Sequence, residues 1–398
     1  MKIPWPPPRL TGFSLGVVLL GFTAVSFGEE AKQEQAYVPQ PGRFAPLGKG
    51  KYISGELVYL DPINRRGGIR LDGNAAGRYS EGPLHYFALL PYATVWHNGS
   101  RAEIRDISIG THVHGYFFVP PQGDEHTIPP LPKEHKRYTI AHNHAVTLED
   151  DFSYYQRRGQ FWEVVSINAR NEKLNVKPAG RKNNDGITTP YTFDIDDRTR
   201  VWLSRRLVDV HDISPDMTVQ FNLAWSQGWG QGEFWIRDIW LDDESRRFAT
   251  ELQRRKHIRY QRQRWAPGWI DHVEIYDFGG GIVTLTLFEV DHEIIDDFRK
   301  ERNDRIAVAC AEKTLRTWFH RADRKFGKLV EWNELETPPL GSSGIQLRLK
   351  FSELLDGYQP GACVRVKCDS WKFVSMPPEE RLSSQEEQQR GAKLTPID

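Results

Sequence analysis

The chain repeats one short pattern, and this repetition constrains the fold more than any other feature. A Val-Trp pair is followed, ten residues after the tryptophan, by Asp-Ile-Ser at two places that lie 106 residues apart. The tryptophans are Trp96 and Trp202, and the triplets begin at Asp106 and Asp212. A spacing of threes also recurs at Ile104, Ile107, Gly110 and Val113, at Val210, Ile213, Asp216 and Val219, and at Leu355, Tyr358, Gly361 and Val364. Self-similarity at a fixed period predicts three copies of one structural unit.

The segments before these patterns predict how each copy begins. Residues 55–61, 161–168 and 269–277 resemble one another and are expected to form the same opening strand. Each runs through a turn into a second expected strand, at 67–71, 174–176 or 280–287. We therefore place the copies at residues 50–155, 156–265 and 266–378 of the chain.

Short β-branched and aromatic runs alternate within a copy with clusters of Gly, Pro, Asn and Asp, which is typical of a sandwich or a barrel. In copy two the later strands are expected at 191–202, 218–225 and 233–241. Five strands in about 100 residues favour a small barrel of the OB type, because closure removes the exposed edges of an open sheet. A small sandwich is the alternative. We predict an all-β protein of three tandem small OB-like β-barrels with a connecting helix.

In this strand order and in its Val-Trp…Asp-Ile-x-x-Gly-x-x-Val pattern, the chain resembles uncharacterised bacterial exported proteins that carry tandem OB-like domains. The resemblance covers most of the chain after its first 28 residues. It implies tandem barrels of unknown function and no known active site.

Copy three and the segments around it depart from the pattern. Trp318 and Tyr358 are 40 residues apart, where Trp96 and Ile107 are 11 apart, so residues 320–348 are predicted to be a loop insertion. Residues 242–265 have a helical composition, acidic at the start and basic towards the end, as the helix dipole favours. We predict a solvated basic helix there, and a disordered tail at 379–398 because that segment is polar.

Residues 1–28 are predicted to be a signal peptide. Lys2 and Arg9 precede an apolar stretch at 11–27 that is short for a membrane span and is followed by Gly28. An uncleaved anchor is the alternative. We expect an exported protein in the periplasm, at the cell surface or outside the cell, with no membrane span after leader removal. The remaining 51 basic and 53 acidic residues give a net charge of −2, which argues against nucleic acid as the partner.

Export would allow two covalent modifications, a disulfide and N-glycosylation. Three cysteines, Cys310, Cys363 and Cys368, permit at most one internal disulfide, and the sequence does not select the pair. Asn98-Gly-Ser matches the N-glycosylation acceptor pattern.

Eight of the thirteen histidines fall between residues 85 and 144, including the pairs His112/His114 and His142/His144. Residues two apart share a face of a strand, so each pair can offer two imidazoles to a metal ion. However, His112 and His114 alternate with Val113 and should lie on the opposite face of their strand, whereas His142 and His144 are an even number of residues from Val146 and should lie on the same face as it. We assume that both valines face the core. The first pair is then expected to point out of the barrel and the second into it, which disfavours a joint four-histidine site and favours solvated strand histidines.

The last hairpin of copy two offers a different site. Trp225, Trp229 and Trp235 flank a Gly-rich segment with glutamine amides, and flat rings beside amides can stack a sugar or a peptide. The alternative is that Trp225 and Trp235 pack into the barrel or a neighbouring copy.

The sequence contains no phosphate loop and no His-Glu-x-x-His motif, and its Gly-x-Ser-x-Gly pattern, at residues 12–16, lies within the predicted signal peptide. We therefore expect a binding or structural module of unknown ligand, with a protein or a polysaccharide as the partner. A metal-dependent enzyme or metal-binding protein centred on the histidine-rich first repeat is the alternative, and no cofactor is assigned.

Overall fold

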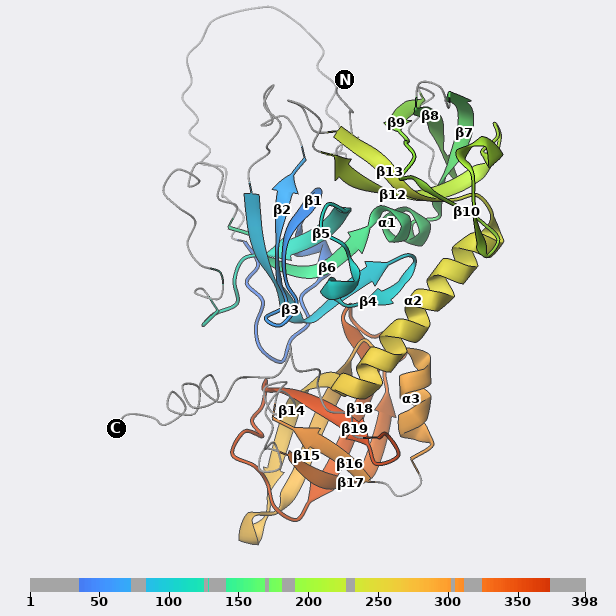
Figure 1. Cartoon of the computed structure of the whole chain (residues 1–398). Coiled ribbons are helices and arrows are strands. Elements are labelled where there is room, and N and C mark those ends of the chain that lie inside the picture. Colours follow the sequence, from blue (N-terminus) through green and yellow to red (C-terminus); the bar gives the residue numbers. More distant parts are fainter. Residues whose placement is uncertain are drawn as a thin grey trace, which may run out of the picture. The chain divides into compact units, whose positions relative to one another are not determined.

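Figure 1 shows the computed structural model of the protein, coloured along the chain. The structure describes residues 36–72, 84–124, 128, 141–168, 172–180, 190–226, 233–301, 305–310 and 324–372. The predicted signal peptide and the predicted disordered tail lie outside these ranges. Strands dominate the described residues and close into three small barrels, so the chain is mostly β as expected.

Barrel 1 closes with five strands. These are β1 (Lys51–Asp61), β2 (Arg66–Leu71), β3 (Leu84–His97), β5 (His112–Phe118) and β6 (His144–Asp150), with the short β4 (Ser100–Ala102) beside β3. β1, β2 and β3 form an antiparallel meander, β5 pairs with β1 and β6, and β6 runs parallel to β3. Leu57, Ile69, Phe87, Val113 and Leu148 fill its core, and none is more than 3% exposed.

Barrel 2 has the same strand order. Its strands are β7 (Gln160–Asn168), β8 (Lys173–Gly180), β9 (Tyr191–Asp194), β10 (Arg200–Leu203), β11 (Arg206–Val208), β12 (Thr218–Ser226) and β13 (Glu233–Trp240). The third strand is divided into β9 and β10, and both run parallel to β13. β12 pairs with β7 and so closes the barrel. Trp162, Phe193 and Phe221 pack against one another in its core.

The repeated spacing of threes has one structural meaning in all three barrels. It carries the chain back to the first strand, where one backbone N–H donates to a carbonyl oxygen of that strand. The donor and acceptor are Gly110 and Leu57 (2.7 Å), Asp216 and Val164 (2.8 Å), and Gly361 and Ile270 (2.7 Å). Each donor residue has a positive φ, and each acceptor precedes a β-bulge in the first strand. The pattern therefore marks the residue of positive φ whose N–H donates to the first strand just before its β-bulge.

Barrel 3 closes differently. Its strands are β14 (Ala266–Ile275), β15 (Gly281–Phe288), β16 (Arg305–Ala309), β17 (Arg324–Glu334), β18 (Ser342–Phe351) and β19 (Cys363–Cys368). They follow the order β14-β15-β18-β17-β16-β19, and every pair is antiparallel. Helix α3 (His292–Arg299) follows β15.

This order corrects the prediction of a loop insertion at 320–348. Residues 324–334 form β17 and β18 begins at Ser342, so most of the segment is strand. β16 and β17 close the barrel between β18 and β19. In barrels 1 and 2 a single strand, β6 or β13, occupies this position and runs parallel to the third strand. The counterpart of the strand that carries Trp96 is therefore β18, while Trp318 lies outside the described residues, between β16 and β17.

Helices α1 (Asp151–Arg157) and α2 (Asp243–Arg264) follow the last strands of barrels 1 and 2. Each begins at an N-cap aspartate, Asp150 or Asp242, whose carboxylate also accepts a backbone N–H from the turn after the third strand. That donor is Asn98 in barrel 1 and Ser204 in barrel 2. Four short 3-10 segments complete the described helices: η1 (Leu47–Lys49), η2 (Ile104–Asp106), η5 (Val210–Asp212) and η6 (Asp277–Gly279).

Helix α2 is not the solvated connector that its composition predicted, because it contacts all three barrels through polar side chains. Arg246 donates to the carbonyl oxygen of Thr218 in barrel 2 (2.7 Å). Gln253 donates to the carbonyl oxygen of Arg101 in barrel 1 (3.2 Å). Arg254 forms an ion pair with Asp291, just before α3 (2.9 Å). The buried residues of α2 are mostly polar: Ser245, Arg246, Gln253, His257, Ile258, Gln261 and Arg264.

An aromatic cluster joins barrel 1 to barrel 3. Phe44 and Tyr92 pack against Trp269 and Phe288, with ring centroids 4.3 to 6.1 Å apart. Among the described residues, Cys310, Cys363 and Cys368 form no disulfide.

Candidate functional site

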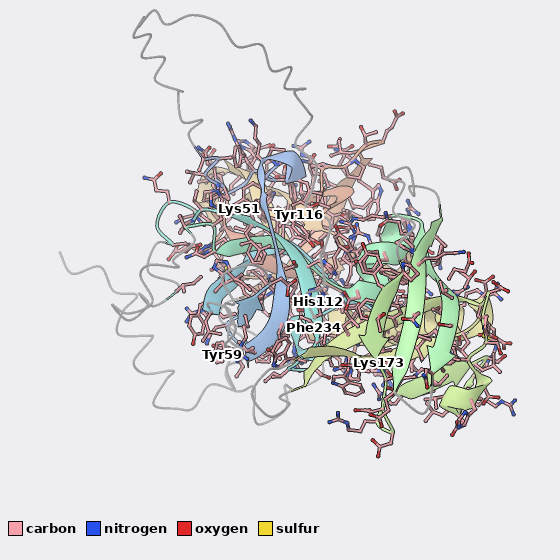
Figure 2. All side chains as sticks on the ribbon, turned by 90° about the horizontal axis from the view of Figure 1, so that it is seen from above. Lys51, Tyr59, His112, Tyr116, Lys173 and Phe234 are labelled. Atoms are coloured by element: carbon pink, nitrogen blue, oxygen red, sulfur yellow. The ribbon has the colours of Figure 1, made fainter. Side chains whose placement is uncertain are left out.

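Two histidines of β5 and the first residue of α1 form a buried cluster at the side of barrel 1. His112, His114 and Asp151 are each at most 1% exposed. Val113, which lies between the histidines, points into the core of barrel 1, so the two imidazoles point away from that core. α1 begins where β6 ends, and its capping by Asp150 brings Asp151 against them. Figure 2 shows His112 next to Phe234, whose ring lies 4.8 Å away between centroids.

The Asp151 carboxylate is the centre of the cluster. Its Oδ1 atom lies 2.7 Å from His112 Nδ1 and 3.0 Å from His114 Nε2. Its Oδ2 atom accepts the backbone N–H of Leu223 in barrel 2 at 2.9 Å. Both oxygens of this buried carboxylate are therefore hydrogen-bonded, and one carboxylate links β5, α1 and β12.

The far nitrogens of both histidines are also hydrogen-bonded. His112 Nε2 lies 2.7 Å from Asp72 Oδ2, and His114 Nδ1 lies 2.7 Å from the Tyr52 hydroxyl oxygen. Since an ionised carboxylate only accepts hydrogen bonds, both nitrogens of His112 donate and the ring is an imidazolium. Burial opposes this charge, but Asp151 and Asp72 outweigh it and raise the pKa of His112 to about 10.

His114 is in the opposite state. Burial and the neighbouring His112 charge lower its pKa, although its hydrogen bond to Asp151 acts the other way. The ring is thus neutral, its Nε2–H donates to Asp151, and its Nδ1 accepts the Tyr52 hydroxyl. The Tyr154 ring stacks on His114 with centroids 3.8 Å apart, and the Arg158 guanidinium lies over Tyr154 at 3.6 Å. Two adjacent histidines therefore hold different charges because of their partners.

The preceding residues, Glu149 and Asp150, are buried acids with separate partners. Asp150 Oδ2 accepts from Asn222 Nδ2 and lies 2.7 Å from His97 Nδ1. Burial raises the pKa of Asp150, but His97 and the hydrogen bonds from Ser153 and the Asn98 backbone lower it further. Glu149 pairs with Arg157 and Arg158. The same Asn222 amide donates to Asn98 Oδ1 at 3.0 Å, so the potential glycosylation asparagine is held in a contact with barrel 2.

The structure brings together only part of the predicted histidine set. Within the described part of the chain, one group of three potential metal ligands is close enough to share an ion, and it comprises His112, His114 and Asp151. The outward direction predicted for the first pair is correct relative to the barrel core, but the pair is buried in protein and not solvated.

The second pair differs from its prediction for a local reason. A β-bulge at Val146 breaks the alternation in β6, so Ala145 and Leu148 face the core of barrel 1 while Val146 packs outside it. His144 shares the side of Val146, and His142 precedes the strand and is partly exposed. Neither joins the cluster. The sequence did not single out Asp151 as a partner of the histidines, because a pair of aspartates at a strand end is a routine turn signal.

Only two of the three tryptophans of the predicted site are among the described residues. Trp229 lies outside the described residues. Trp235 is 8% exposed and lies under the Arg198 guanidinium. Trp225 packs against Phe234, and its backbone N–H donates to Gly110 of barrel 1 at 2.8 Å. The two described tryptophans therefore pack within barrel 2 and against barrel 1, as the alternative prediction stated.

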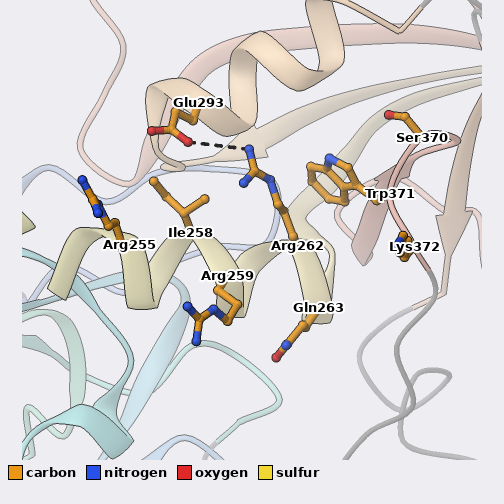
Figure 3. Close-up of a pocket in the computed structure, with 9 residues that line it drawn as sticks. All are labelled: Arg255, Ile258, Arg259, Arg262, Gln263, Glu293, Ser370, Trp371 and Lys372. Carbon is orange, nitrogen blue, oxygen red and sulfur yellow. Dashed lines mark ion pairs between the residues drawn. The ribbon is translucent and has the colours of Figure 1, made fainter. Parts of the chain in front are cut away.

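The solvent side of α2 carries two grooves. One, of about 510 Å³, is lined by α2, α3 and the residues after β19, including Arg255, Arg259, Arg262, Trp371 and Lys372 (Figure 3). The other, of about 460 Å³, is lined by Arg205, Arg247, Phe248, Leu252 and Arg255, with Glu244 and Glu251. Because Arg255 lines both grooves, they follow one another along the helix.

Comparison with known proteins gives no assignment: no protein-family model, no curated protein and no solved structure matches the chain. Across the described residues, no helix is both long and apolar enough to cross a membrane. Any functional conclusion has to come from the geometry of the chain itself.

Proposed function

We propose that the protein is an exported binding or structural module, similar to the uncharacterised bacterial proteins with tandem OB-like domains, and that it works in the periplasm or at the cell surface. The strand order of barrels 1 and 2 supports an OB-like assignment, because a three-strand meander is closed by a fourth strand and by a fifth that runs parallel to the third. Barrel 3 would be a variant of this barrel in which β16 and β17 replace the fifth strand.

The observation that carries a binding role is the pair of consecutive grooves along α2. Six basic side chains line them against three acidic ones: Arg205, Arg247, Arg255, Arg259, Arg262 and Lys372 against Glu244, Glu251 and Glu293. Phe248 and the 61% exposed Leu252 add apolar surface. A positively charged surface that follows one long helix suits an extended acidic segment of a protein partner.

The buried side of α2 holds the helix, and with it the two grooves, in place. Its opposite side is buried against three barrels, with Arg246, Gln253 and Arg254 each hydrogen-bonded to a different one. A partner would then bind without ordering the helix first, which reduces the entropy lost on association.

Fluorescence anisotropy with a labelled polyglutamate peptide tests this proposal. We expect binding that weakens with salt, and at least tenfold weaker binding by the double variant Arg255→Glu/Arg259→Glu. Lys350→Glu, which reverses an exposed charge on β18, is the matched control and should bind as the wild type does. No binding by the wild type, or equal loss in both variants, would reject the acidic-partner role. A glycan array that gave specific binding abolished by Trp225→Ala would instead support a polysaccharide partner.

A further inference from the structure

We propose that His112, His114 and Asp151 bind one divalent transition-metal ion, with zinc as the probe ion. This inference is independent of the binding role of α2. The three side chains come from β5 and α1, and one donor atom from each lies within 4.8 Å of the others. Imidazole nitrogen and carboxylate oxygen are ligands that Zn²⁺ uses in proteins.

The outer atoms of all three side chains are held in the way that metal ligands require. His112 Nε2 faces the Asp72 carboxylate, His114 Nδ1 faces the Tyr52 hydroxyl, and Asp151 Oδ2 accepts the Leu223 N–H. Such outer partners fix ring orientation and leave the inner atom to bind the ion. With Nε2 on the ion, the His114 proton would move to Nδ1, which would then donate to the Tyr52 hydroxyl oxygen. The ion would be held by His112 Nδ1, His114 Nε2 and Asp151 Oδ1.

Two of the three distances between ligand atoms require only a small adjustment. A tetrahedral zinc ion with bonds of about 2.0–2.1 Å places two ligand atoms about 3.3 Å apart. Asp151 Oδ1 now lies 2.7 Å from His112 Nδ1 and 3.0 Å from His114 Nε2. The His112 and His114 rings are perpendicular, with centroids 4.7 Å apart, so their donor atoms approach the ion from different directions. Three protein ligands leave the fourth position to water.

Charge and burial favour an ion here as well. Asp72 and Asp151 both face His112, and a divalent cation balances two carboxylates when His112 is neutral. Phe234 and Tyr154 cover the histidines, and the three ligands are at most 1% exposed. Because the site is enclosed, the ion would enter as the chain folds and would join barrel 1 to α1 and, through Leu223, to barrel 2.

The first measurement is the metal content of tag-free protein purified with and without a chelator. We expect about one zinc per chain when folding occurs with zinc present, and a raised unfolding temperature relative to the chelator-treated protein. Refolding with Co²⁺ should give the visible d–d absorption of a tetrahedral site. Asp151→Asn and His114→Ala should lose the ion and the cobalt absorption.

Two further variants keep all three ligands, so they test zinc binding even if the ligand variants fail to fold. Asp72→Asn keeps all three ligands and removes one outer partner at a partly exposed residue, so we expect zinc affinity about 10- to 100-fold lower. His142→Ala/His144→Ala removes two imidazoles of the same barrel and should leave zinc content unchanged. A wild type that folds with no zinc and whose unfolding temperature does not respond to zinc would overturn the proposal, as would unchanged zinc affinity in Asp72→Asn. The cluster would then be a hydrogen-bonded ion pair alone.

Discussion

His257, on the buried side of α2, makes the attachment of that helix sensitive to acid. The side chain is 5% exposed, and its Nδ1 atom has no hydrogen-bond partner among the described residues. Burial first, and then the Arg101 charge, lower the pKa of His257 to about 4, although Asp106 and Asp291 act in the opposite direction. An unfolded histidine has a pKa of about 6.5.

The sign and size of the effect follow from these two pKa values. Between pH 6.5 and 4 the unfolded chain binds a proton at His257 and the folded chain does not, so the free energy of unfolding falls as the pH decreases. From pH 7 to pH 5 this one residue accounts for a loss of about 2 kcal/mol. The loss continues until the pH reaches the folded pKa. His85, which is also buried with a pKa lowered to about 4, adds a separate loss in barrel 1.

Hydrogen exchange of the α2 backbone at pH 7 and pH 5, followed by mass spectrometry, isolates the helix from the rest of the chain. We expect the opening free energy of residues 243–264 to fall by about 2 kcal/mol in the wild type and much less in His257→Gln. His211→Gln, the same change at an exposed histidine, should behave as the wild type. If His257→Gln and the wild type lose equal amounts between the two pH values, His257 is not a buried neutral residue and the reasoning fails.

Three further predictions concern contacts within and between the barrels. Asn222→Leu leaves the buried Asp150 carboxylate short of a donor, so we expect the free energy of unfolding to fall by about 3 kcal/mol in urea denaturation. Gly99→Ala places a Cβ against Gln156 at a φ of +79°, and a loss of about 2 kcal/mol should appear as a lower melting temperature. Trp269→Ala removes the centre of the aromatic cluster and should lower stability by about 3–5 kcal/mol in calorimetry, whereas a loss below about 1 kcal/mol would show that the cluster is not a packed contact.

Local patterns in the sequence predicted the parts of the fold that short-range geometry decides. The third positions of the spacing of threes are Gly110, Asp216 and Gly361, which have positive φ and contact the first strand in all three barrels. Strand alternation around Val113 also gave the direction of His112 and His114 relative to the core. The positive φ and the strand alternation depend on residues near one another in the chain, so a sequence can show them. The return hydrogen bonds join residues 53, 52 and 91 positions apart, and only the structure shows them.

The candidate site could not be assembled in the same way. Asp151 meets His112 and His114 from 37 to 39 residues away, and its second oxygen bonds to Leu223, 72 residues away. The bulge at Val146 turned the second histidine pair away from its predicted side, because one extra residue inverts the alternation of a strand.

By itself the sequence determined that the chain forms repeated small β units, because strand period and turns are local properties. Tertiary structure alone decided how barrel 3 closes, where β16 and β17 replace a parallel strand. It also decided that one side of the polar helix α2 is buried, because Arg246, Gln253 and Arg254 each find an acceptor on a different barrel. Hydrogen bonds between distant residues leave no period in a sequence, and only the folded chain shows which partners meet.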